Sequence, residues 1–131
     1  MPIILTYNIN GIRAAIKKDL PKWINSTSAD IVCLQEIKAK EEQFDKEIFE
    51  EYGYSSYIKS AEKPGYSGVA IISKIKPQYI EYECGISKID SEGRFIRLDF
   101  ENYSVLSVYF PSGSSGDLRQ AFKIEFLNLF S

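Results

Sequence analysis

The chain has 131 residues, of which 44% are hydrophobic and 26% are charged, a composition typical of one globular domain with a modest core. It contains no histidine, which excludes a histidine-based zinc site and a Ser-His-Asp triad built from this chain alone. The formal net charge of −2 provides no overall attraction to nucleic acid, so binding to DNA would require a local basic surface.

No run of about 18 consecutive apolar residues occurs, and the first residues lack the basic region and long apolar stretch of a secretory signal. We therefore expect a soluble, cytoplasmic protein with no membrane partner. The two cysteines, Cys33 and Cys84, are expected to be free thiols. Cys33 lies inside an apolar run, where a small buried thiol fits better than a disulfide or a metal ligand.

The first third of the chain predicts a strand, a broken helix and a second strand. Residues 3–7 form the first strand, which should break at the Asn and Gly residues of 8–11, because both types tolerate positive φ. Residues 13–26 are expected to be helical with a break near Asp19, whose side chain would cap the second part. Residues 30–36 are an apolar run that turns polar at its end, typical of a central parallel strand. The opening therefore predicts a βαβ unit.

A second helix is expected over residues 41–52, with Gly53 placed to end it. Phe44, Ile48 and Tyr52 recur there at helical spacing, with acidic residues between them.

Beyond this helix, strands dominate and predict an antiparallel meander. The expected strands cover residues 54–59, 68–73, 78–83, 94–100 and 103–110. The short connection of Glu101 and Asn102 predicts a hairpin between the last two. A loop over residues 111–116 and a last helix, which begins near Asp117 as its cap, complete the chain.

Polar side chains follow the two strands of the predicted βαβ unit. Asn8 and Asn10 follow the first strand, and Gln35 and Glu36 end the second. Because ligands collect at the carboxyl ends of parallel strands, we expect these four side chains to converge on one crevice. One carboxylate with amide oxygens and water suits a hard cation such as Mg²⁺. The pattern alone also fits an ordinary Asn-Gly turn beside a solvated strand end.

Two further features leave alternatives open. Tyr109 ends another apolar strand, where its hydroxyl could reach the same rim or simply pack as an amphipathic side chain. The sequence Gly-Tyr-Ser-Gly at residues 65–68 would let a phosphate approach the backbone closely, and it equally suits a turn that enters a strand.

Five sequence blocks, taken in order, resemble the exonuclease III and apurinic/apyrimidinic endonuclease family. The blocks are TYNINGIRA at 6–14, DIVCLQEIK at 30–38, GYSGVAI at 65–71, EGRFI at 92–96 and VYFPSGSSG at 108–116. The resemblance implies that Glu36 is the family's metal-binding glutamate and that Asn8, also assigned to the metal, and Asn10 line the metal and phosphate site. Tyr109 would contact the scissile phosphate.

The same resemblance places four residues near the expected DNA groove: Arg13, Lys38, Tyr66 and Arg94. The basic residues among them would contact phosphates and position the duplex without reading its sequence.

The resemblance also implies the fold class, a DNase I-like four-layered α/β sandwich with a mixed sheet and flanking helices. Each half of the family's domain would supply one sheet, and the active site would lie across their shared upper edge. Residues 1–131 would then be the amino-terminal half of a single domain, apparently truncated. The family's second half contributes an Asn and an Asp at the catalytic centre and a late Asp-His pair, which are absent here.

The implied activity is a Mg²⁺-dependent DNA-repair nuclease, with Mn²⁺ as a substitute metal, that is monomeric when full length. It would hydrolyse phosphodiesters of double-stranded DNA 5′ to an abasic site or stepwise from a 3′ end, and the chain alone would be inactive. One alternative is a phosphatase of the wider superfamily acting on a small phosphorylated substrate. Another is a non-catalytic fragment or scaffold. The GYSGVAI and YFPSG strings favour DNA.

Overall fold

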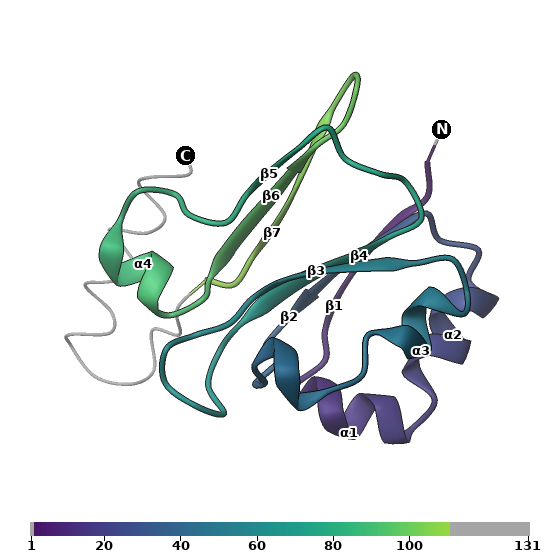
Figure 1. Ribbon diagram of the computed structural model, residues 1–131, viewed down its shortest axis with the longest axis horizontal. Helices are drawn as coiled ribbons and strands as arrows, with labels where there is room; N and C mark the ends of the chain where they lie inside the picture. The colour runs from purple at the N-terminus through teal and green to yellow at the C-terminus, as the bar shows by residue number, and fades with distance from the viewer. Residues whose placement is uncertain (1, 111–131) are drawn as a thin grey trace.

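The structure, a computed structural model, describes residues 2–110 and consists of two β-sheets packed face to face, with short helices outside them (Figure 1). The first sheet has the order β1-β2-β4-β3, and the second has the order β5-β6-β7. The first contains β1 (Ile4–Asn8), β2 (Ile31–Gln35), β3 (Ser55–Lys59) and β4 (Val69–Ser73). The second contains β5 (Tyr79–Glu81), β6 (Phe95–Asp99) and β7 (Ser104–Val108).

Most of the helical turns cover one face of the first sheet. They are α1 (Ile12–Lys17), α2 (Leu20–Ser26), the 3-10 helix η1 (Glu41–Gln43) and α3 (Glu47–Glu50). Figure 1 shows α1, α2 and α3 on the side of this sheet that faces away from the second sheet, whereas α4 (Ser87–Ser91) lies beside β6. The described part of the chain is therefore layered as helices, sheet and sheet.

The predicted βαβ unit is confirmed. β1 and β2 run parallel and are joined by α1 and α2, with residue 4 opposite residue 31 and residue 8 opposite residue 35. Residues 31–34 are all buried, as expected for a central strand. On its other side β2 pairs with β4 in the antiparallel sense, so the sheet is mixed.

Side-chain alternation along β2 divides the core into two parts. Val32 and Leu34 pack among the helices, whereas Ile31 and Cys33 pack between the sheets. Both cysteines are free thiols, as predicted. Burial raises the pKa of the Cys33 thiol to about 11, so this thiol stays protonated at neutral pH.

The expectation that this chain supplies a single sheet is wrong, because residues 2–110 already form two. β3 and β4 join the first sheet, and the predicted meander consists only of β5, β6 and β7. β4 is buried at every position, which suits a strand covered by helices on one face and by the second sheet on the other. The predicted hairpin between the last two strands is confirmed by the antiparallel pairing of β6 and β7.

The single helix predicted over residues 41–52 is also wrong. Phe44 is extended, with φ −148° and ψ 159°, and it separates η1 from α3. Asp45 Oδ1 then accepts the backbone N–H of Glu47 at 2.9 Å, which satisfies a free donor at the start of α3. Gly53 does end the helical segment, with a φ of 86° and its N–H bonded to the Glu50 carbonyl.

Two smaller corrections concern local structure. Asp19 precedes α2 as predicted, but its φ of 65° is left-handed and its side chain makes no capping hydrogen bond. The short helix α4 falls between two expected strands and was not predicted. The expected loop over 111–116 and the last helix lie outside the described residues. Within residues 2–110, no helix has the length and apolar character needed to cross a membrane.

The segment between β3 and β4 is held against both sheets. Its end bonds to the loop after β2 through Ile37 N to Gly68 O at 3.1 Å, and its start bonds to α4 through Glu62 N to Ser91 O at 2.8 Å. Gly93 makes this second contact possible, because a Cβ at this position would lie 2.5 Å from the backbone nitrogen of Ala61. Backbone packing, with no side chain between, therefore joins this loop to the start of β6.

We expect Gly93→Ala to lower the free energy of unfolding by about 2–4 kcal/mol, because it combines an unfavourable positive φ with overpacking against the backbone. Gly85→Ala is the matched control: its φ is also positive, at 92°, but an added Cβ would meet no atom of the described chain within 4 Å. The control should cost about 1 kcal/mol. Equal losses for the two variants in urea unfolding would contradict the close contact at Gly93.

Candidate active site

The carboxyl ends of β1 and β2 bring Asn8 and Glu36 together. The parallel register places Asn8 opposite Gln35, so the residue that follows β2 lies beside the end of β1. Asn8 Nδ2 donates a hydrogen bond to Glu36 Oε1 at 2.7 Å. Two side chains separated by 28 positions in the sequence thus form one polar pair.

The loop that follows β1 is bonded to the loop that follows β2. Asn8 Oδ1 accepts the backbone N–H of Asn10 at 3.1 Å, and the Glu36 carbonyl accepts the N–H of Gly11 at 2.7 Å. Lys38 Nζ donates to Asn10 Oδ1 at 2.6 Å and lies 3.7 Å from Glu36 Oε2. The Glu36 carboxylate is therefore approached by an amide on one oxygen and an ammonium on the other.

Strained backbone is concentrated in these loops. Asn10, Glu36, Lys38 and Ser67 have φ values between 47° and 54°, in the left-handed region that non-glycine residues seldom adopt. Such residues each cost on the order of 1–3 kcal/mol and persist where surrounding contacts fix them, most often at functional sites. Here the hydrogen bonds between the loops supply that constraint, including Lys38 N to the Ser67 carbonyl at 2.9 Å.

Gln35 was expected to lie in the same crevice as Asn8 and Glu36, but its side chain lies between the two sheets. Its Nε2 donates to Thr6 Oγ1 and to Ser107 Oγ, each at 3.1 Å, and Ser107 Oγ donates to the Leu34 carbonyl at 3.0 Å. Side chains alternate along a strand, so Gln35 faces the second sheet like Cys33. It therefore connects β1, β2 and β7 and aligns the two sheets beneath the Asn8 and Glu36 pair.

Tyr109 follows β7 and reaches the same polar pair. Partial burial raises the pKa of its hydroxyl most, and the charge of Glu36 and a hydrogen bond with that carboxylate raise the pKa further. The nearby Arg94 guanidinium acts in the opposite direction. The neutral phenol is therefore the favoured form of Tyr109, and a neutral phenol can donate a hydrogen bond.

Arg94 and Tyr66 lie behind Tyr109. Arg94 is only 1% exposed and donates to Tyr66 Oη at 3.0 Å, to the Tyr109 carbonyl at 3.2 Å and to Glu92 Oε1 at 2.8 Å. Its guanidinium carbon lies 4.9 Å from the centroid of the Tyr109 ring. Glu92 was not predicted as a site residue, because its partnership with Arg94 depends on the burial of Arg94 just before β6.

A basic hollow lies on the α1 side of the site. Arg13, Lys17 and Lys38 line it together with Gly11, Ala14 and Gly65, and its volume is about 430 Å³. Arg13 is exposed, and one of its guanidinium nitrogens lies 3.4 Å from the Lys38 carbonyl. Lys17 was not predicted, although its position four residues after Arg13 places both on one helix face.

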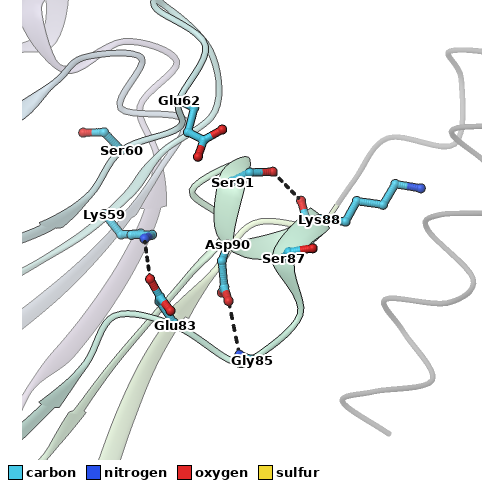
Figure 2. Close-up of a pocket in the computed structure, with 9 residues that line it drawn as sticks. All are labelled: Lys59, Ser60, Glu62, Glu83, Gly85, Ser87, Lys88, Asp90 and Ser91. Atoms are coloured by element: carbon cyan, nitrogen blue, oxygen red, sulfur yellow. Dashed lines mark hydrogen bonds and ion pairs between the residues drawn. The ribbon is translucent and has the colours of Figure 1, made fainter.

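A second hollow, of about 570 Å³, lies at the β3 edge of the first sheet and contains no part of the Asn8 and Glu36 pair (Figure 2). Three of its charged groups, Lys59, Glu83 and Asp90, have partners inside the hollow. Lys59 Nζ lies 3.8 Å from Glu83 Oε1, and Asp90 accepts the backbone N–H groups of Cys84 at 2.9 Å and Gly85 at 3.2 Å. We therefore place the candidate site at the ends of β1 and β2.

The donor set suits a hard divalent cation. Within residues 2–110 no group of three or more His, Cys, Asp or Glu side chains could hold a metal, and Glu36 is the carboxylate that the ends of β1 and β2 present. Mg²⁺ commonly uses one or two carboxylates and keeps several waters, which fits this arrangement. Asn8 presents its amide nitrogen to Glu36, and its oxygen already accepts the Asn10 N–H.

Comparisons with known proteins give consistent matches. The Endonuclease/Exonuclease/phosphatase family matches residues 5–130. The exodeoxyribonuclease of Bacillus subtilis (strain 168) is 40% identical over 114 residues, which cover 86% of this chain and 44% of that protein. The DNA repair nuclease APEX1 of Danio rerio is 34% identical over 129 residues, which cover 94% of this chain and 42% of that protein.

A solved structure supports the same relationship. The AP endonuclease from Archaeoglobus fulgidus superposes with a TM-score of 0.87 at 27% identity, over 99% of this chain and 49% of that one. This likeness confirms the expected α/β sandwich. The chain spans about half the length of the relatives that it matches.

We expect Glu36→Gln to lower the pKa of Tyr109, because the change removes the negative charge that opposes ionisation of the phenol. Burial would still hold the value above that of a free tyrosine. A pH titration of ¹³Cζ-labelled tyrosine by NMR measures the shift, with Tyr109→Phe identifying the signal. Glu83→Gln, which removes an exposed carboxylate at the far edge of the sheet, is the control. An unchanged Tyr109 titration in Glu36→Gln would contradict the contact.

Proposed function

The chain belongs to the Endonuclease/Exonuclease/phosphatase family, and from this membership we propose that it supplies one wall of the active site of a Mg²⁺-dependent DNA-repair nuclease of the exonuclease III type. The observation that carries the proposal is the Asn8 and Glu36 pair at the ends of two parallel strands, with Tyr109 beside it. Two relatives that are at least 34% identical are named as an exodeoxyribonuclease and a DNA repair nuclease.

The proposed reaction is hydrolysis of a phosphodiester in double-stranded DNA, either 5′ to an abasic site or stepwise from a 3′ end. In this reaction Glu36 would hold Mg²⁺ or Mn²⁺ through its carboxylate. The bound metal would stabilise negative charge on the scissile phosphate and on the leaving oxygen. Asn8 fixes the orientation of Glu36 through its 2.7 Å hydrogen bond, and Asn10 is fixed in turn by Lys38.

Tyr109 is proposed to hold the phosphate. Its pKa is raised by burial and by Glu36, so its hydroxyl keeps a proton that it can donate to a phosphate oxygen. A donor fixed beside the metal ligand helps to orient the scissile bond before the reaction.

Phosphates away from the cleaved bond are proposed to bind Arg13, Lys17 and Lys38. These three cations line one hollow beside the Asn10 loop, and none of residues 2–110 that line it is acidic. The chain has a net charge of −2, so such a local cluster is the means by which it would attract a polyanion. Tyr66, in the loop before β4, is proposed to contact the same duplex. The cytoplasmic location and monomeric state stay predictions.

We expect Glu36→Gln to reduce Mg²⁺-dependent cleavage of an abasic duplex by about 100-fold or more, with little change in DNA affinity. The measurement is steady-state cleavage, together with binding in the absence of metal, by a protein that contains this chain and the rest of the family's domain. Glu83→Gln is the matched control and should retain activity. Cleavage of inositol phosphates in preference to DNA would instead favour a small-molecule phosphatase, and unchanged cleavage in Glu36→Gln would refute the role of Glu36.

We also propose that the 131-residue chain has little or no nuclease activity by itself. It spans less than half of its two curated relatives, and groups that act as one unit in catalysis lose most of the rate when part of the set is removed. Incubation of the purified chain with an abasic duplex and Mg²⁺ tests this. Measurable nicking that disappears with Glu36→Gln would show that the chain holds a complete catalytic set.

A further inference from the structure

An ion pair between the buried Arg94 and the half-buried Glu92 links the candidate catalytic tyrosine with the loop before β4. Arg94 Nε lies 2.8 Å from Glu92 Oε1, and the Arg94 side chain is 2% exposed whereas that of Glu92 is 20% exposed. Tyr66 Oη donates to the same Glu92 oxygen at 3.3 Å and accepts from Arg94 at 3.0 Å. Arginine, glutamate and tyrosine therefore form a closed triangle of hydrogen bonds.

Arg94 also contacts Tyr109. Arg94 donates to the Tyr109 carbonyl at 3.2 Å, and the Tyr109 N–H donates to the Arg94 carbonyl at 3.0 Å. The guanidinium lies against the face of the Tyr109 ring, with its carbon 4.9 Å from the centroid. Cations in this position are attracted by the aromatic ring, most strongly where water is excluded. Both the backbone and the ring of Tyr109 are thus held by one side chain.

We propose that Glu92 and Arg94 are positioning residues that fix Tyr109 beside Glu36 and hold the hydroxyl of Tyr66, and that Arg94 does not contact DNA phosphate. This inference rests on the proposed nuclease function, and it replaces the expected role of Arg94 in binding DNA. A phosphate ligand needs an accessible cation, whereas the Arg94 side chain is 2% exposed and its guanidinium donates to protein acceptors.

The geometry explains why arginine and glutamate occupy these positions. Arg94 uses its Nε and both terminal nitrogens in three directions, toward Glu92, the Tyr109 carbonyl and Tyr66. Lysine offers one nitrogen at the end of a flexible chain and cannot reproduce this fork. Glu92 neutralises the buried guanidinium, which would be costly without a partner.

The decisive measurement separates positioning from phosphate contact. Each lost phosphate contact lowers the slope of log K against log salt concentration by about one, whereas a misplaced catalytic group lowers kcat and leaves that slope unchanged. We expect Arg94→Lys to lower kcat by about 10- to 100-fold, with the KM for an abasic duplex and the salt slope unchanged. Glu92→Gln should act in the same direction and more weakly, because its amide oxygen can still accept both hydrogen bonds.

Arg97→Gln is the matched control. Arg97 lies on β6, three residues after Arg94, its side chain is 38% exposed, and it donates to Asp99 at 3.1 Å. Normal kcat and an unchanged slope are expected for it. A lower salt slope and a higher KM in Arg94→Lys, with kcat unchanged, would overturn the proposal and return Arg94 to a phosphate contact.

Tyrosine NMR spectra provide a test that does not depend on activity or on Arg94→Lys folding. Glu92→Gln should shift the ¹³Cζ signals of both Tyr66 and Tyr109, whereas Arg97→Gln should shift neither. If the wild-type protein cleaved no DNA, the nuclease proposal would fail, and these spectra would still decide whether Glu92 and Arg94 fix the two tyrosines. A signal change in Tyr66 alone would refute the coupling.

Discussion

The parallel pairing of β1 with β2 is the constraint on which the candidate site depends. Parallel strands end at the same edge of a sheet, and the register that sets residue 8 opposite residue 35 places Glu36 within hydrogen-bonding distance of Asn8. Gln35 strengthens this arrangement from below, since its amide bonds to Thr6 on β1 and Ser107 on β7. A shift of one residue in register would move Glu36 away from Asn8 and turn Gln35 out of the space between the sheets.

The polar groups above this edge form a connected series that runs across the top of both sheets. Lys38 donates to Asn10 and lies near the Glu36 carboxylate. The charge of Glu36 raises the pKa of Tyr109, and Arg94 donates to the Tyr109 carbonyl. Because the segments that carry these residues come from both sheets, their relative position depends on sheet packing as well as on local loops. The close approach at Gly93 and the bridge at Gln35 are therefore part of the support of the site, although neither is proposed to touch a substrate.

Sequence patterns predicted those parts of the site that depend on local or nearest-neighbour structure. Asn8 and Glu36 could be paired in advance because a βαβ unit brings its two strand ends together whatever the rest of the chain does. The predicted position of Gln35 was wrong, because a residue's place at the end of a strand does not determine on which face of the sheet its side chain lies. The burial of Arg94 depends on Tyr66, 28 residues earlier, and on Glu92, so no local pattern could show it.

The errors in the fold have the same origin. Phe44, Ile48 and Tyr52 all pack against the helix-side core, and two short helical turns joined by an extended residue satisfy their spacing as well as one continuous helix would. Strands β3 to β7 have similar apolar runs, and composition does not indicate which sheet a strand joins. Sheet membership is decided by which faces are buried, as the complete burial of β4 illustrates.

The left-handed residues around the site also limit how this sequence can change during evolution. A substitution at Glu36 that keeps the hydrogen bond with Asn8 needs an acceptor oxygen and must also tolerate a φ of 54°, so this position is subject to two independent constraints. Glycine at position 36 would remove the backbone strain but also the carboxylate. A β-branched residue would lose the carboxylate and increase the backbone strain. Asn10 and Lys38 likewise combine a positive φ with a side-chain hydrogen bond, which they make to each other. Neutral drift should therefore be slow at these positions, and new specificities would arise more easily in the surrounding surface than at the strand ends themselves.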